Sequence, residues 1–72
     1  MQKTGTLIIN DTKRLDIRFD LTTYHGSLQV GDSLELLIEN RWIETTVGFD
    51  VNWYLSGIRT DNLIGLRVKI TL

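Results

Sequence analysis

The chain has 72 residues, of which 42% are hydrophobic, and this composition is typical of one small folded domain rather than of a disordered segment. It contains no cysteine and one histidine, so disulfides and thiolate metal sites are excluded and we expect neither metal nor cofactor. Eight basic and nine acidic residues give a net charge of −1, which disfavours non-specific binding to nucleic acid. There is no bilayer-length apolar run and no signal-peptide core, so we expect a cytoplasmic protein without membrane association.

Two strands are predicted in the first twenty residues. Residues 5–10 are rich in β-branched side chains, and residues 14–20 alternate between polar and apolar positions. A turn of about three residues between the two strands would place Leu7 opposite Ile17. The charged positions of the second strand, Asp16 among them, are then expected on a solvated outer face.

Residues 20–32 show no clear period and are predicted to form a long polar loop. The single histidine, His25, follows Tyr24 there, but catalysis would also need an orienting acid and an oxyanion site. We therefore interpret His25 as an exposed loop residue and assign no catalytic residue. Leu28 and Val30 are expected to anchor the end of the loop to the core.

Residues 34–58 predict a meander of three strands, around which the rest of the chain is organised. The first pair alternates apolar and polar positions on both sides of a short turn. A two-residue loop at Asn40-Arg41 would place Leu36 opposite Thr45. Shifting this register by one residue would turn the apolar set outward, so the pattern strongly limits the pairing.

The second turn of the meander is predicted at residues 50–52, with positive φ at Asn52. This turn sets Phe49 opposite Trp53, and both rings are expected to pack into the core. Gly48 would then lie opposite Tyr54 on the outer face, where a ring can cover a bare glycine.

The final part of the chain is predicted to hold a helical turn and a strand. Asp61 could cap a single turn over residues 60–65 that Gly65 ends. In the strand that follows, every second side chain from Leu66 to Leu72 is expected to point inward. We expect this strand to pair with the first strand and close the sheet. With no sustained helical period elsewhere, the whole chain, residues 1–72, is predicted to be one all-β domain: a strongly bent antiparallel barrel of five or six strands.

An outward apolar and aromatic face is the first candidate for a functional surface. Its predicted members are Leu37, Trp42, Tyr54 and Ile58, together with Tyr24 from the loop. In the predicted registers Leu37, Glu44 and Ile58 share a row, with Trp42 diagonal to Leu37. Aromatic anchors dominate protein interfaces, so this face predicts a protein partner or self-association into a homodimer. The alternative is a minor core covered by the long loop or the amino-terminal segment.

A basic patch is the second candidate. Its predicted members are Arg14, Arg18, Arg67 and Lys69. If the first and last strands pair, these residues could contact nucleic acid through phosphate groups, with Tyr24 available for stacking. Asp16 and Asp20 dilute the positive charge, and the alternative is a solvated face of mixed charge.

Part of the chain resembles SH3 domains. The run Leu28-Gln-Val30-Gly31-Asp32, entering a leucine-rich strand, is similar to their diverging turn and second strand. Trp42 resembles the tryptophan that opens the third SH3 strand and lines the peptide groove. Asp61-Asn62-Leu63-Ile64 stand where the proline and tyrosine of that groove are expected. The resemblance covers about residues 20–72 and implies a small SH3-like barrel.

Over its whole length the chain resembles a family of short, uncharacterised bacterial proteins associated with phage and conjugative elements. The matching segments are Lys3-Thr4-Gly5-Thr6-Leu7, Asp16-Ile17-Arg18-Phe19, Gly31-Asp32, Trp42-Ile43, Trp53-Tyr54-Leu55 and Leu63-Ile64-Gly65-Leu66-Arg67-Val68. The resemblance implies a fold but no activity. We expect a non-enzymatic interaction module with a protein partner; the alternative is a nucleic-acid-associated accessory protein of a mobile element.

Overall fold

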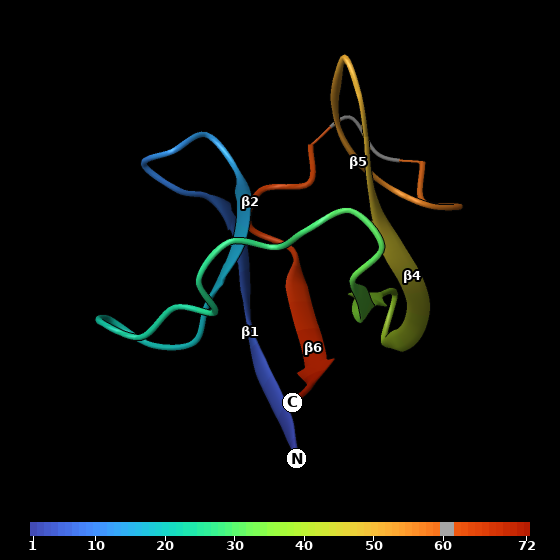
Figure 1. The fold of residues 1–72 in the computed structure, drawn as a ribbon. Helices are drawn as coiled ribbons and strands as arrows, with labels where there is room; N and C mark the ends of the chain where they lie inside the picture. Colours follow the sequence, from blue (N-terminus) through green and yellow to red (C-terminus); the bar gives the residue numbers. More distant parts are fainter. Residues whose placement is uncertain (60–61) are drawn as a thin grey trace.

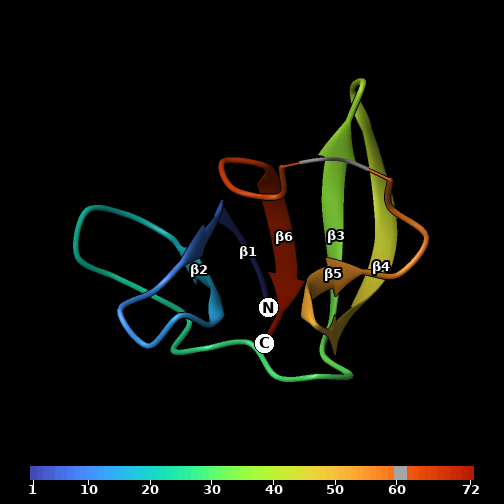
Figure 2. The same ribbon diagram turned by 90° about the horizontal axis from the view of Figure 1, so that it is seen from above.

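The computed structural model describes residues 1–59 and 62–72, and it is all-β as predicted. Its six strands are β1 (Gln2–Ile9), β2 (Leu15–Arg18), β3 (Ser33–Ile38), β4 (Arg41–Asp50), β5 (Asn52–Leu55) and β6 (Arg67–Thr71). They form one antiparallel sheet in the order β2-β1-β6-β3-β4-β5, which curls into a half-barrel (Figures 1 and 2). Within these described ranges no helix is long and apolar enough to span a membrane.

The core lies inside the curl and is built from aliphatic side chains of every strand and of the long loop. Its buried members are Leu7, Leu15, Ile17, Leu28, Leu34, Leu36, Val47, Leu55, Val68 and Ile70. Phe19, Trp53 and Ile58 are partly buried around it. The alternation within each strand directs these residues to one face, and burial of their apolar surface drives the curl.

The pairing of β1 with β2 follows the predicted register. Leu7 lies opposite Ile17 and Ile9 opposite Leu15. The predicted strand bounds differ, because β1 begins at Gln2 and β2 ends at Arg18. The early end of β2 lets the chain turn away into the long loop.

The first and last strands pair, as predicted, but the sheet does not close completely. β6 lies between β1 and β3, pairing with β1 from Gln2 to Thr6 and with β3 at two positions only. No ladder joins the outer strands β2 and β5 among the described residues. The loop covers the free edge of β2 instead: His25 N–H donates to Ile17 O at 2.8 Å and Leu28 N–H to Leu15 O at 2.7 Å.

The turn between β3 and β4 lies one residue earlier than predicted. Glu39 and Asn40 both have positive φ, 50° and 65°, as in the two-residue turns that match the twist of a hairpin. Leu36 therefore faces Ile43, not Thr45. The register is shifted by two residues, which keeps every side chain on its predicted face.

The pairing of β4 with β5 is confirmed, with Phe49 opposite Trp53 and Gly48 opposite Tyr54. The residue with positive φ is Val51, at 67°, and not Asn52. The hairpin projects beyond the body of the sheet (Figure 1). Phe49 is consequently 53% exposed, so the prediction that it packs in the core is wrong.

Several predictions at the ends of segments are also wrong. Val30 is exposed, and Leu28 alone anchors the end of the loop to the core. Leu72 is exposed because it lies beyond the end of β6. Of the predicted helical turn over residues 60–65, residues 62–63 are irregular and residues 64–65 form a turn, whereas residue 60 and the proposed cap at Asp61 lie outside the described residues.

Candidate functional site

The outer side of β3 and β4 carries the central pair of the predicted partner surface. Trp42 lies directly opposite Leu37, not diagonal to it as predicted. The Lys69 ammonium lies 4.4 Å from the centroid of the indole ring and 3.8 Å from Glu35 Oε2. Trp42 as a whole residue nevertheless remains 37% exposed. We call these four residues, Glu35, Leu37, Trp42 and Lys69, the Trp42 face; it is an exposed aromatic surface with a charged border.

The predicted row of Leu37, Glu44 and Ile58 does not exist. Glu44 lies opposite Glu35, because the β3–β4 register is shifted by two residues. The β4–β5 ladder ends at Leu55, and the chain then turns inward. Ile58 packs against the core and is not an outer-face residue.

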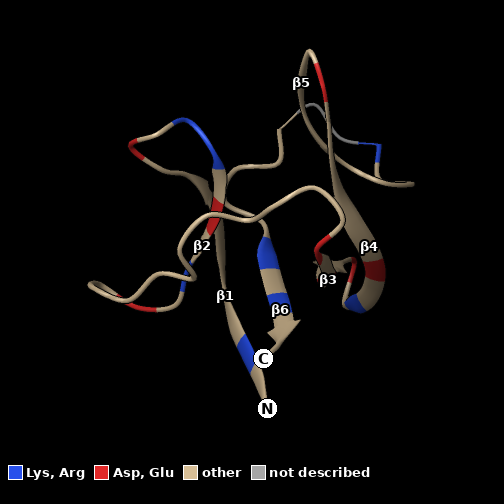
Figure 3. Ribbon diagram, in the orientation of Figure 1, with Lys and Arg blue, Asp and Glu red and all other residues tan. Residues whose placement is uncertain are grey.

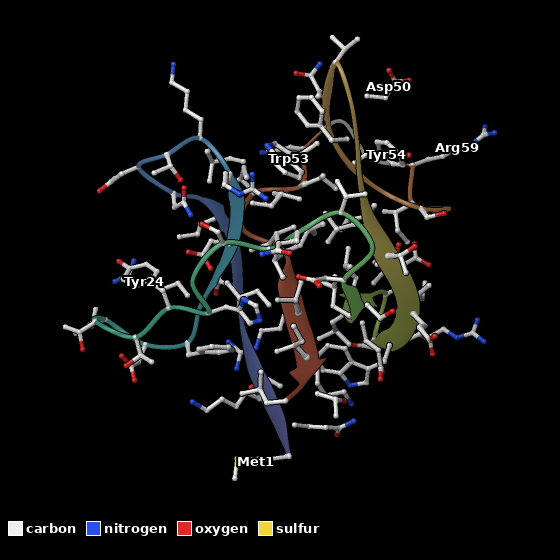
Figure 4. The ribbon with its side chains drawn as sticks, in the orientation of Figure 1. Met1, Tyr24, Asp50, Trp53, Tyr54 and Arg59 are labelled. Atoms are coloured by element: carbon white, nitrogen blue, oxygen red, sulfur yellow. The ribbon has the colours of Figure 1, made fainter. Side chains whose placement is uncertain are left out.

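Tyr54 and Tyr24 are both exposed, but they lie apart from Trp42. Tyr54 covers Gly48, where an added Cβ would overlap the ring atom Cζ, and this confirms the predicted pairing of ring and glycine. Tyr24 forms a bridge with Arg18 beside β2. Figure 4 shows the two tyrosines on opposite sides of the molecule, so the predicted surface divides into separate parts.

The four predicted basic residues also divide. Arg18 and Arg67 both lie opposite Thr6, and the three residues form one row across β2, β1 and β6. Arg14 turns away from this row, because its guanidinium stacks on a β5 tryptophan and donates to a carbonyl of the long loop. Lys69 belongs to the Trp42 face. Figure 3 shows only basic positions on β1 and β6, and an acidic position on β2.

His25 is partly buried, so its predicted full exposure is wrong. Its Nδ1 atom is buried and has no hydrogen-bond partner among the described residues. The ring lines a cleft of about 450 Å³, together with Asp32, Glu35 and Lys69. Within residues 1–59 and 62–72 no hydroxyl bonds to Nδ1 as a nucleophile would. The described residues also hold no group of three His, Cys, Asp or Glu that could bind a metal ion.

Asp16 is a structural centre that the sequence pattern places wrongly, on the solvated face. It is 3% exposed, and its Oδ1 accepts hydrogen bonds from Ile17 N–H at 2.8 Å and Gly26 N–H at 2.9 Å. Asn10 Nδ2 donates to Asp16 Oδ2 at 3.3 Å and to Ser27 Oγ at 2.8 Å. These bonds fix the long loop across β2. The alternation alone gives no signal for them, because Gly26 comes from the long loop and Asn10 from the β1–β2 turn, outside the strand that carries Asp16.

Comparison with known proteins shows one similar crystal structure and one matching protein family. A crystal structure of a protein from Ruminococcus gnavus is similar, with a TM-score of 0.89 and 33% identity over 94% of this chain and 100% of that one. No curated protein matches the chain. The family model described as "Domain of unknown function (DUF5348)" matches residues 5–70, nearly the whole chain. The chain therefore belongs to the DUF5348 family.

Proposed function

We propose that the protein is a non-enzymatic, SH3-like interaction module that binds a protein partner through the Trp42 face. The observation that carries this proposal is the exposed indole of Trp42, which Leu37 and Lys69 hold in place on the sheet. A ring fixed before binding loses little freedom in a complex, and tryptophan is among the side chains that contribute most to interfaces.

The charges around the ring indicate the kind of partner segment. Glu35 and Glu44 lie side by side, and Lys69 neutralises one of them across 3.8 Å. Glu44 has no ion-pair partner among the described residues. An apolar side chain on the indole, followed by a basic residue near Glu44, would complement both features.

Affinity capture from the native host, with quantitative mass spectrometry, tests this proposal. The comparison is between the wild type, Trp42→Ala and Tyr24→Ala. Tyr24 is an exposed aromatic residue on another side of the molecule, 48% exposed against 37% for Trp42, and serves as the matched control. We expect a set of proteins that Trp42→Ala loses and Tyr24→Ala keeps. Equal capture by all three forms would reject the Trp42 face as the binding surface.

A second candidate is a nucleic-acid-associated accessory role for a mobile element. It is supported by the row of Arg18, Thr6 and Arg67 across three neighbouring strands. Arg18 Nε donates to Asp20 O at 3.1 Å, and the Arg67 guanidinium donates to Thr4 Oγ1 at 3.4 Å. Neither guanidinium pairs with a carboxylate among the described residues. The resemblance to proteins of phage and conjugative elements agrees with this role, whereas the net charge of −1 opposes it.

A salt-dependent gel shift with single- and double-stranded DNA separates the two candidates. Phosphate contacts would supply most of the affinity, so binding should be strongest at low salt. The double variant Arg18→Gln/Arg67→Gln should weaken it, and Trp42→Ala should not. Absence of binding by the wild type at low salt would eliminate this candidate.

A further inference from the structure

The tip of the β4–β5 hairpin combines two unfavourable features in one residue. Val51 has φ of 67°, a conformation that glycine and asparagine tolerate and that β-branched residues rarely adopt. Its side chain is also 84% exposed. Strained residues of this kind persist where a structure uses them, often in contacts with other molecules.

The other apolar side chains near this tip are exposed as well. Phe49, two residues before Val51, contacts Trp53 edge-to-face at 4.9 Å, yet more than half of its surface is exposed. Tyr54 on the same hairpin is exposed as well. An apolar group of this size at the end of a projecting hairpin is typical of a docking element.

An apolar groove lies beside the hairpin. It has a volume of about 300 Å³, and the β5 residues form one side of it. The other side comes from the end of β1 and the segment before β6, where Ile9 and Ile64 are exposed and Leu63 is partly buried. The same molecule therefore presents an apolar projection and an apolar recess.

We propose that the hairpin tip, Phe49 and Val51, of one copy occupies the groove of a second copy, and that two copies form a symmetric homodimer. A two-fold axis makes the same patch its own partner, so the tip and the groove are covered in one step. This surface is separate from the Trp42 face and leaves that face free.

The charges at the two parts are complementary. Asp50 lies at the outer end of the hairpin (Figure 4). Trp53 lines the groove, and the Arg14 guanidinium lies 5.0 Å from the centroid of its ring, so one basic group stands beside the groove. Each Asp50 would face Arg14 of the other copy. A net charge of −1 adds little repulsion between copies.

Sedimentation velocity of the full chain, from micromolar to millimolar concentration, tests the dimer. The 8.3 kDa monomer should associate to twice its mass as the concentration rises. Val51→Asn removes the apolar anchor and relieves the strained φ, so the variant should melt no lower than the wild type while its dimer dissociation constant rises about tenfold or more. Val30→Asn, at an exposed valine of the long loop, is the matched control and should leave the constant unchanged.

Three outcomes would overturn the proposal. A wild type that is monomeric at every concentration would leave the tip to a different protein. A dimer that Val51→Asn does not weaken would place the interface elsewhere. Equal weakening by Val51→Asn and Val30→Asn would indicate non-specific apolar association.

Discussion

Two strand glycines, Gly5 and Gly48, show how single residues allow the sheet to curl. An added Cβ at Gly5 would lie 2.6 Å from both Arg18 O and Ile17 Cγ2. At Gly48 the same atom would meet the outer part of the Tyr54 ring. The obstacle at Gly5 includes the main chain of Arg18, which cannot move without disturbing the β1–β2 ladder. The obstacle at Gly48 is the Tyr54 ring, which can rotate away.

Alanine at these two positions should therefore have unequal effects. We expect Gly5→Ala to lower the free energy of unfolding by about 3 kcal/mol and Gly48→Ala by about 1 kcal/mol, since overpacking against a fixed backbone costs more. Urea denaturation measures both. In a Tyr54→Ala background the effect of Gly48→Ala should largely disappear, because the two residues share one contact. Equal losses at both glycines would contradict the difference in mobility.

The carboxylate of Asp20 fixes the first turn of the long loop. Its Oδ1 accepts the backbone N–H groups of Thr22 and Thr23, each at 2.9 Å. The backbone bond from Thr22, followed by the Thr23 hydroxyl, holds the pKa of Asp20 below its ordinary value. Because the pKa is lower in the folded state, the stabilisation is present above the unfolded pKa and is lost as pH falls through the folded one.

Titration of the Asp20 carboxyl by NMR should accordingly give a midpoint below the ordinary value of 3.8. Protonation weakens both backbone bonds, so the amide signals of Thr22 and Thr23 should shift with the same midpoint. Asp20→Asn keeps an acceptor oxygen but does not titrate, and should remove that pH dependence. A midpoint at or above 3.8 would contradict the hydrogen-bonded turn.

At the scale of elements, alternation predicts the faces of strands well and their neighbours less well. The β1–β2 register and the pairing of Phe49 with Trp53 are confirmed. The β3–β4 turn is displaced, since a shift of two residues leaves every face unchanged and period-two patterns cannot distinguish the two registers. The strand positions were therefore largely predictable.

The alternation of polar and apolar residues in a strand does not predict which other segment covers each face of that strand. Asp16 occupies a predicted outer position but is buried, because the long loop crosses β2 there. Phe49 occupies a predicted inner position but is exposed, because its hairpin extends past the core. The members of the candidate partner surface were predicted least accurately. Leu37 and Trp42 do pair as outer residues, whereas Ile58 lies beyond the end of the β4–β5 ladder. These placements depend on contacts between elements distant in the sequence.

The two tryptophans should differ in their effect on stability. Trp53 packs against the core and its Nε1 bonds to Lys13 O, whereas Trp42 lies on the outer face. We expect Trp53→Ala to lose about 3 kcal/mol, a large part of the stability of so small a domain, and Trp42→Ala about 1 kcal/mol. Thermal melts followed by circular dichroism compare them. The reverse order would contradict the assignment of the inward face.

At the scale of the whole molecule, β6 holds two halves together. The β1–β2 hairpin lies on one side of it and the β3–β4–β5 meander on the other (Figure 2). Outside these ladders, the bond from Trp53 to Lys13 and the crossing of the long loop also join the halves. The two ends of the chain meet beside β6, where Leu72 N–H donates to Met1 O at 2.7 Å.

This arrangement predicts that the order of the strands along the chain can be changed without loss of the fold. A circular permutant that joins Leu72 to Met1 through a short glycine-serine linker, and is opened between Glu39 and Asn40, keeps every ladder intact. Opening this exposed turn should cost about 1–2 kcal/mol, since it releases one loop while the linker closes another. Circular dichroism and amide NMR spectra should match those of the wild type.

A variant that lacks residues 67–72 is the experiment to compare with the circular permutant. It removes the one strand that pairs with both halves, so each half would expose its part of the core. We expect the shortened chain to be unfolded by the same spectra. The opposite result would be an unfolded permutant and a folded deletion variant. It would show that the two halves are stable without β6 and would contradict the role of β6 as the joining strand.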